Sequence, residues 1–556
     1  MGWILQPHPA NDLAAMGEEF MMRDWKHALL PTRPSFLLAL VLAVSQVAAA
    51  RAADQVKIAS GTLEGMALDH SNVRAFLGIP FAAPPIGKLR WQPPQPVETW
   101  QGVRKALAFG PRCMQRNIYS DMVFRDSGPS EDCLYLNVWT PAGSASESLP
   151  VMFWIYGGGF QAGGTSEPRQ EGMNLAKKGV VVVSCNYRLG IFGFFSHPAL
   201  TRESPHHASG NYGLMDQIAA LRWVKQNIAA FGGNPNNVTI FGESAGSFSV
   251  SFLMASPLAQ GLFQKAIGES GASFGAGPNL HSAETLTQTE KAGEKFAQSI
   301  GATSLASLRA IPARKLSEES AKGHFWPNID GYLLPQDVNT IFVEGRQSHV
   351  PLLAGWNKDE EAGVLYSKKT PPTAENLVKS LKERFGPDAD QALKYYPHST
   401  AAETRQSTEN LASDFFTVYG TWKWLEMQNK TGDSPVYRYL FTRTPPEPLS
   451  ETDDGIPLVK LGARHSAEIE YVFGVLKWKK IPWQPVDFKV SDAMMRYWSN
   501  FAKTGNPNGS GLPHWPRYSP QGRQVMVLGE SIHSQPATDQ KRFEFIDSSV
   551  ARYRDK

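Results

Sequence analysis

Ser244 lies in a glycine-flanked turn, Gly242-Glu243-Ser244-Ala245-Gly246, directly after the apolar run Val238–Phe241. A serine in a G-x-S-x-G turn between a strand and a helix is held in a strained conformation that projects its hydroxyl. The flanking glycines allow backbone segments to approach where side chains would collide. The pattern therefore predicts a nucleophilic serine that attacks a carbonyl carbon.

A run of glycines, Gly157-Gly158-Gly159, follows the apolar run Val151–Ile155. Attack on a carbonyl places negative charge on its oxygen, and backbone N–H groups without side chains can stabilise that charge. Ala245, next to the nucleophile, offers another N–H group. A dinucleotide-binding loop is the alternative, but it needs G-x-G-x-x-G at the start of a helix, and Phe160–Gly164 does not fit that pattern.

A serine nucleophile needs a base that takes its proton and a carboxylate that orients the base. In this arrangement the acid and the histidine follow the serine along the chain. Lys358–Glu361 is an acidic segment that follows the apolar run Val350–Ala354, and a solvated acidic turn is its alternative reading. His465 lies in a predicted loop before a short helix. Chain order alone leaves further histidines open, namely His324, His349, His398, His514 and His533.

Short apolar, β-branched runs alternate with helical patterns such as Met215–Phe231. This alternation predicts an α/β fold with a large, mostly parallel central sheet flanked by helices. Gly61–Ala67 and Val73–Ile79 predict a hairpin at one edge, and the polar segment Ala283–Ala401 predicts an added helical lobe. The predicted strands are Leu134–Trp139, Val151–Ile155, Val180–Ser184, Val238–Phe241, Val350–Leu353 and Val436–Phe441.

The charge is nearly balanced, at +3 over 556 residues, and basic residues occur singly or in pairs. A nucleic-acid partner is therefore not expected. The absence of repeats and of long linkers favours one large domain with insertions over two independent domains.

The segment Ser35–Ala50 is an apolar run that follows basic residues and ends in small residues. This layout is typical of a secretory signal peptide. The apolar core is shorter than the roughly 20 residues needed to span a bilayer, so we expect no permanent membrane anchor. We predict an N-terminal extension and signal peptide over residues 1–52, cleavage near Ala50 to Ala53, a hydrolase domain over residues 53–556, and a secreted or periplasmic protein.

Three cysteines are present. In an oxidising compartment Cys113 and Cys133 could close a loop worth roughly 3 kcal/mol in the chain-entropy model, but their spacing does not exclude two free thiols. Cys185 ends a run that reads as a buried strand, and we expect it to be a packed, unreactive thiol.

The chain resembles the type B carboxylesterases, which include cholinesterases and bacterial p-nitrobenzyl esterases, from Val56 to about Tyr518. This resemblance implies the α/β-hydrolase fold and a carboxylic-ester hydrolase that works through an acyl-enzyme without metal or organic cofactor. The matching segments are Phe76–Ala82, Leu89–Trp91, Glu131–Trp139, Trp154–Phe160, Asn186–Gly190, Asn211–Asp216, Phe231–Pro235, Phe241–Gly246 and His465–Gly474.

The resemblance also implies roles for particular residues. Ser244, Glu360 and His465 would form the triad, although Glu361 stays open because relatives usually read Asp-Glu-Gly where this chain has Asp359-Glu360-Glu361. The remaining implied roles are oxyanion donors at Gly158, Gly159 and Ala245, residues around the triad at Glu243, Ser270 and Glu468, and a disulfide between Cys113 and Cys133.

Departures from the resemblance bear on the substrate, for which a small-molecule ester is the expected class. The segment between Cys113 and Cys133 contains no tryptophan, so it lacks the cation–π site with which cholinesterases bind choline. Arginines near the predicted mouth of the site could bind an acyl group with free carboxylates, as in fumonisin-type esters; plain surface arginines are the alternative. These arginines are Arg112, Arg116, Arg125 and Arg169.

Two other functions share parts of this pattern. An amidase or carbamate hydrolase would show the same residues. A non-catalytic binding protein of cholinesterase-like fold usually lacks the nucleophile, and the presence of Ser244, His465 and the glycine run argues against it.

Overall fold

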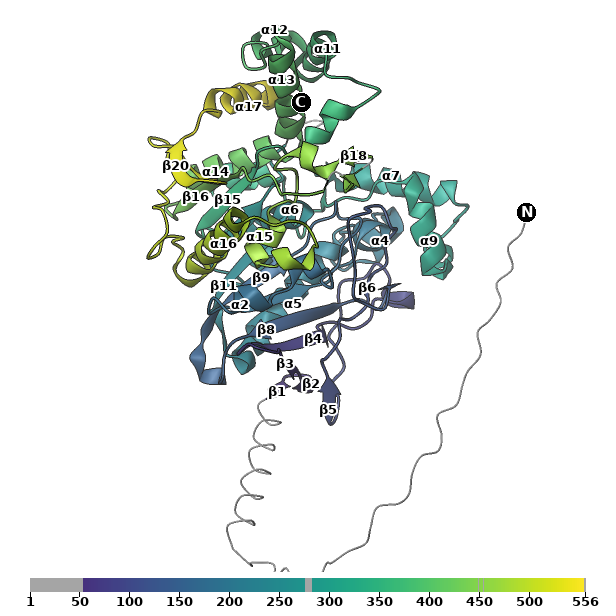
Figure 1. Cartoon of the computed structure of the whole chain (residues 1–556). Coiled ribbons are helices and arrows are strands. Elements are labelled where there is room, and N and C mark those ends of the chain that lie inside the picture. The colour runs from purple at the N-terminus through teal and green to yellow at the C-terminus, as the bar shows by residue number, and fades with distance from the viewer. Residues whose placement is uncertain (1–53, 276–282, 449, 454, 555–556) are drawn as a thin grey trace, which may run out of the picture. The chain divides into compact units, whose positions relative to one another are not determined.

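The computed structural model describes residues 54–275, 283–448, 450–453 and 455–554 (Figure 1). An 11-stranded mixed sheet forms the centre. Its seven adjacent strands from β19 to β10 all pair in parallel. In sheet order the strands are β20 (Ile532–Pro536), β19 (Gln524–Leu528), β16 (Val436–Phe441), β15 (Leu352–Asn357), β12 (Lys265–Glu269), β11 (Gly233–Glu243), β9 (Leu149–Ile155), β10 (Val181–Cys185), β8 (Tyr135–Thr140), β4 (Arg74–Pro80) and β3 (Met66–Ala67).

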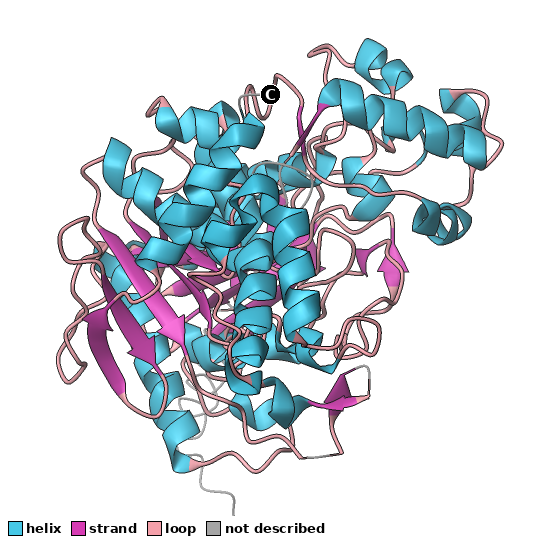
Figure 2. Ribbon diagram, turned by 90° about the horizontal axis from the view of Figure 1, so that it is seen from above, coloured by secondary structure: helices cyan, strands magenta, loops and turns pink. Residues whose placement is uncertain are grey.

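The parallel strands are buried because helices lie on both faces of the sheet (Figure 2). All five residues of β10 are buried, as expected for a parallel strand covered on both sides. The helices α5 (Tyr212–Asn227), α6 (Ala245–Ala255) and α14 (Tyr419–Thr431) pack against β11, β12, β15 and β16. The helices α2 (Met173–Ala176) and α16 (Pro485–Thr504) pack against β8, β9, β10 and β11, and α15 (Ile469–Phe473) packs on both of them.

The chain has further helices, several of which are labelled in Figure 1. They include the predicted lobe, which is helical but is interrupted by β15 of the central sheet. Their bounds are α3 (Gly190–Phe194), α4 (Pro198–Glu203), α7 (Leu286–Ser299), α8 (Leu305–Ala310), α9 (Ala313–Glu319), α10 (Val338–Val343), α11 (Ala374–Phe385), α12 (Ala389–Ala392), α13 (Ala401–Ser413) and α17 (Gln540–Arg554).

The predicted edge hairpin forms only in part. Met66–Ala67 pairs antiparallel with β4, but the preceding strand β2 (Gly61–Glu64) leaves this sheet. It pairs with β1 (Gln55–Ile58) and β5 (Val103–Lys105) in a separate sheet of three strands. Gly65, between β2 and β3, marks the break, because its backbone lies so close to Phe76 that a Cβ there would be 2.6 Å from the ring.

The predicted signal segment Ser35–Ala50 lies outside the described residues, and the division of the chain at residues 52 and 53 stays a prediction. None of the helices in the described part of the chain is long and apolar enough to cross a membrane.

Candidate active site

Ser244 occupies the sharp turn between β11 and α6, with φ 55° and ψ −123°. These dihedrals are unusual for a residue with a side chain and are typical of a strained nucleophile turn. The backbones pack so closely here that a Cβ on Gly246 would lie 2.0 Å from the carbonyl oxygen of Ile155. The Ser244 N–H donates to the Glu269 carbonyl at 2.9 Å, which fixes the turn to β12. Contacts with neighbouring backbone segments therefore hold the turn in its strained conformation.

The glycine run after β9 lies beside Ser244. A Cβ on Gly157 would be 2.9 Å from the Ser244 Cβ. Gly158 has φ +100°, and a Cβ there would lie 2.1 Å from the Ala162 carbonyl oxygen, so only glycine fits. Among the described residues, no acceptor takes the N–H groups of Gly158, Gly159 or Ala245. These three donors remain available to an oxyanion beside Ser244.

Glu360 and His465 form a hydrogen-bonded pair, with 2.6 Å between Glu360 Oε2 and His465 Nδ1. The Glu360 carboxylate is buried, and its other oxygen accepts from the Asn357 N–H at 2.7 Å. Glu361, the open alternative, instead has its backbone N–H bonded to Ser413 Oγ at 3.2 Å. Of the two adjacent glutamates, Glu360 is thus the one that holds the imidazole and can set its tautomer.

The Nε2 edge of His465 faces the residue before the nucleophile. Nε2 lies 3.3 Å from Glu243 Oε1, and the same oxygen accepts a 2.6 Å hydrogen bond from Ser466 Oγ. Burial lowers the pKa of His465, but the negative charges of Glu243 and Glu360 outweigh it and raise that pKa above its usual value. The site therefore favours an imidazolium, the form that stores the proton of an attacked serine.

More carboxylic acids lie behind this pair. Glu468 Oε2 accepts a hydrogen bond from Asn357 Nδ2 at 2.5 Å, and Glu269 Oε1 accepts one from Trp498 Nε1 at 2.7 Å. Burial, with the neighbouring charges of Glu243 and Glu360, raises the pKa of Glu468 to about 8. Burial and Glu468 likewise raise the pKa of Glu269 well above its usual value. The raised pKa of each acid favours its neutral, protonated form, which limits the negative charge around His465.

The buried Ser270 hydroxyl has no hydrogen-bond partner in the described part of the chain. Its backbone N–H donates to the Gly355 carbonyl at 2.9 Å, so that Ser270 is fixed at the carboxyl end of β12. The positions predicted around the triad, Glu243, Ser270 and Glu468, all lie in this buried region.

Three residues that had no predicted role beside His465 support it. Asn357 contacts Glu360 and Glu468, and Ser466 contacts Glu243. Arg169, considered above only as a carboxylate binder, donates from Nη2 to the Ser466 carbonyl at 2.6 Å and contacts Glu470 at 3.4 Å. The only signal for Asn357 and Ser466 was their position beside the acidic segment and beside His465. Of the other candidate histidines, His349 contacts Gly345 and His533 contacts Ser531.

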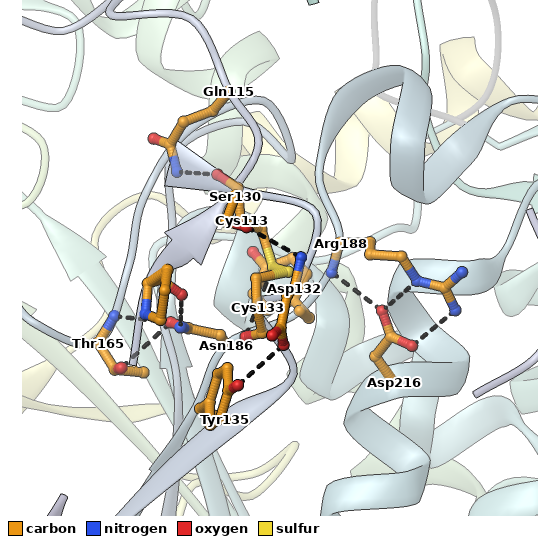
Figure 3. Close-up of a disulfide and its surroundings, with 12 residues drawn as sticks. Cys113, Gln115, Ser130, Asp132, Cys133, Tyr135, Thr165, Asn186, Arg188 and Asp216 are labelled. Carbon is orange, nitrogen blue, oxygen red and sulfur yellow. Dashed lines mark hydrogen bonds and ion pairs between the residues drawn. A yellow bond between two sulfur atoms is a disulfide. The ribbon is translucent and has the colours of Figure 1, made fainter. Parts of the chain in front are cut away.

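A disulfide joins Cys113 and Cys133, while the buried Cys185 is free, as predicted. Figure 3 shows the hydrogen bonds around the disulfide. Gln115 Nε2 donates to the Cys113 carbonyl at 2.9 Å, and the Asp132 N–H donates to Ser130 Oγ at 3.1 Å. The segment between the cysteines contacts the glycine run. A Cβ on Gly158 would lie 3.1 Å from Met122 Cε, and a Cβ on Gly159 would lie 3.1 Å from the Tyr119 hydroxyl oxygen.

The site is assembled at one edge of the sheet, where the carboxyl ends of β9, β11, β12 and β15 meet. Ligands of open α/β sheets bind at this edge. The sheet order and the serine turn after β11 define an α/β hydrolase. The comparisons with known proteins agree with this class and identify the family within it.

The chain belongs to the carboxylesterase family, whose sequence model matches residues 52–546. It is 37% identical over 495 residues to a protein named fumonisin B1 esterase from Sphingopyxis macrogoltabida, covering 85% of this chain and 86% of the relative. It is 35% identical over 484 residues to the para-nitrobenzyl esterase of Bacillus subtilis, covering 83% of this chain and 92% of the relative. The crystal structure of a Geobacillus stearothermophilus carboxylesterase matches with a TM-score of 0.76 and 32% identity, covering 89% of this chain and 100% of that chain. The protein is therefore a carboxylic ester hydrolase with the α/β-hydrolase fold.

Proposed function

We propose that this protein hydrolyses small-molecule carboxylic esters through an acyl-enzyme on Ser244, with His465 as the general base and Glu360 as its orienting acid. The observation that supports this most strongly is the 2.6 Å hydrogen bond between Glu360 and His465 Nδ1. The other ring nitrogen, Nε2, lies 3.3 Å from Oε1 of Glu243, the residue before Ser244, so it faces the turn that carries the nucleophile.

In the first half of the reaction, Ser244 Oγ attacks the ester carbonyl carbon while His465 Nε2 takes the hydroxyl proton. The N–H groups of Gly158, Gly159 and Ala245 donate to the oxyanion. His465 then gives the proton to the departing alcohol. In the second half, His465 takes a proton from water, the hydroxide attacks the acyl carbon, and the acid leaves as Ser244 recovers its proton. Glu360 holds the imidazole through both halves and stabilises the imidazolium.

We further propose that the substrates extend to bulky or polycarboxylate esters. The similarity to a relative named fumonisin B1 esterase supports this range. The protein is proposed to be secreted or periplasmic, on the basis of the export signal predicted at Ser35–Ala50 and of the disulfide between Cys113 and Cys133.

The test is acid release from a panel of esters by the mature protein and by Ser244→Ala. The panel runs from short p-nitrophenyl esters to polycarboxylate esters and includes amides matched to them. We expect wild type to hydrolyse esters and the variant to lose at least ~10³-fold in kcat. Faster turnover of the matched amides would replace the esterase assignment by an amidase. Equal activity of wild type and variant would remove Ser244 from the mechanism.

A further inference from the structure

Three of the four arginines near the mouth of the site are engaged by acids of the protein itself. Arg112 pairs with Asp126 at 2.6 Å, and Arg125 pairs with Glu171 at 2.8 Å. Arg169 contacts Glu470 at 3.4 Å and holds the Ser466 carbonyl. These guanidinium groups have structural partners and are not available to a substrate carboxylate.

Arg116 differs from these three arginines. In the part of the chain that the structure describes, it has no ion pair, hydrogen bond or aromatic ring as a partner, although it is half-buried. It lines a narrow pocket with the polar residues Gln115, Gln161, Ser317 and Ser320 and with apolar residues. A guanidinium that is partly removed from water and left without an anion is unfavourable unless a ligand supplies the missing charge. The apolar residues are Met114, Ile118, Leu189, Ile191, Phe192 and Phe325.

Residues that line the pocket form hydrogen bonds with the oxyanion segment, the loop Gly157–Gly164. Gln115, next to Arg116, donates from Nε2 to the Gly163 carbonyl at 2.7 Å and accepts from the Gly163 N–H at 2.9 Å. Gln161, which lines the pocket, donates its N–H to the Gly158 carbonyl at 3.0 Å. Tyr119, three residues after Arg116, reaches Gly159 with its hydroxyl. Because three extended residues span at most about 10 Å, the Arg116 backbone lies within about 10 Å of the backbone of Tyr119, whose hydroxyl reaches the oxyanion segment.

We propose that Arg116 is a specificity residue that binds a carboxylate carried by the ester at a distance of several bonds from the scissile carbonyl. The proposal rests on the proposed esterase function and names a substrate class for it. The guanidinium can donate two parallel hydrogen bonds to a carboxylate, and the Gln161 amide is a further donor at the pocket wall. Gln115, Ser317 and Ser320 add further polar residues to the pocket lining.

The test compares matched substrates that differ in one charge. Mono-p-nitrophenyl esters of succinic, glutaric, adipic, pimelic and suberic acid present a free carboxylate at increasing distance, and p-nitrophenyl alkanoates of equal length are their neutral partners. Steady-state kinetics would be measured for wild type, Arg116→Gln, Arg116→Lys and the control Arg346→Gln. Arg346 is exposed, pairs with Glu344 and does not line the pocket.

We expect the ratio of kcat/KM for charged over neutral esters to rise with chain length in wild type. Arg116→Gln should lower the ratio for the longer diacid esters about 10-fold or more, mainly through KM, because a charge-assisted hydrogen bond is lost. Arg116→Lys should retain part of the ratio, and Arg346→Gln should retain all of it. An Arg116→Gln enzyme with an unchanged ratio would overturn the proposal, whether or not its overall activity falls. If wild type hydrolyses none of these esters, the proposed function itself fails and this inference fails with it.

Discussion

At the scale of single residues, the site distinguishes two glutamates of identical chemistry. Glu360 holds His465 Nδ1, whereas in the described part of the chain the Glu361 carboxylate makes no hydrogen bond to His465. We therefore expect Glu360→Gln to lower kcat by about 10³- to 10⁴-fold, because a neutral amide no longer selects the useful tautomer of the imidazole. Glu361→Gln is the matched control and should change kcat less than about 5-fold. Steady-state kinetics on one p-nitrophenyl ester measure both, and the reverse order of effects would assign the acid to Glu361.

Glu243 controls the charge of His465 without being its orienting acid. Its carboxylate lies 3.3 Å from Nε2 and raises the pKa of the imidazolium. His465 acts as a base only when deprotonated, so kcat/KM should rise with pH through that pKa. Glu243→Gln removes the charge, and we predict that the acid limb of the kcat/KM–pH profile moves to lower pH. A limb at the same pH in both proteins would show that another group sets it.

The sequence predicts some of these residues far better than others. Ser244 is recognisable because its turn is local, with every required residue within two positions of it. Glu360 and Glu361 cannot be separated by type, since the path of the chain after β15 decides which one turns inward. Ser466 escapes prediction because its partner Glu243 lies 223 positions away, and no local pattern records such a contact.

At the scale of elements, the close crossing of β9 and α6 holds the nucleophile in place. Gly246→Ala would put a Cβ 2.0 Å from the Ile155 carbonyl oxygen. We expect a loss of about 1–3 kcal/mol in unfolding free energy from this overpacking, together with lower kcat as Ser244 shifts. Gly363→Ala is the control, because a Cβ there meets nothing within 4 Å. Thermal unfolding and ester hydrolysis report the two effects, and equal behaviour of the variants would contradict a tight crossing.

All six strands predicted from apolar runs are present in the central sheet, which confirms the predicted fold class. Two strands of the parallel region were not predicted. β12 (Lys265–Glu269) begins and ends with a charged residue although all five of its residues are buried. β19 (Gln524–Leu528) follows a polar loop near the end of the chain. Tertiary burial, rather than local pattern, makes β12 a strand. In β19 the apolar run Val525–Leu528 is a local strand pattern that the prediction missed.

At the scale of the whole molecule, buried acids link stability to pH. The pKa of Glu468 is about 8 in the folded protein, against a usual value of 4.5. Between these two pH values the folded state keeps a proton that the unfolded chain has released, so stability falls as pH rises through this window. The slope for one such group is at most about 1.4 kcal/mol per pH unit. Glu468→Gln removes this group, and we predict that its Tm falls less than that of wild type between pH 5 and pH 8. Parallel Tm curves would contradict the raised pKa.

The central claim, a covalent acyl-enzyme on Ser244, is tested most directly by trapping it. Ser244 Oγ attacks the phosphorus of a p-nitrophenyl phosphonate and displaces p-nitrophenolate; the phosphonyl group that stays on the serine mimics the tetrahedral intermediate and is not released by water as an acyl group is. After reaction with this reagent, intact-mass measurement and peptide mapping should find one phosphonyl group per chain, on the peptide that contains Ser244. Ser244→Ala should remain unlabelled, and the extent of labelling in wild type should match the loss of esterase activity. Full inhibition with the adduct on another residue, or full labelling of Ser244 with esterase activity retained, would contradict the account.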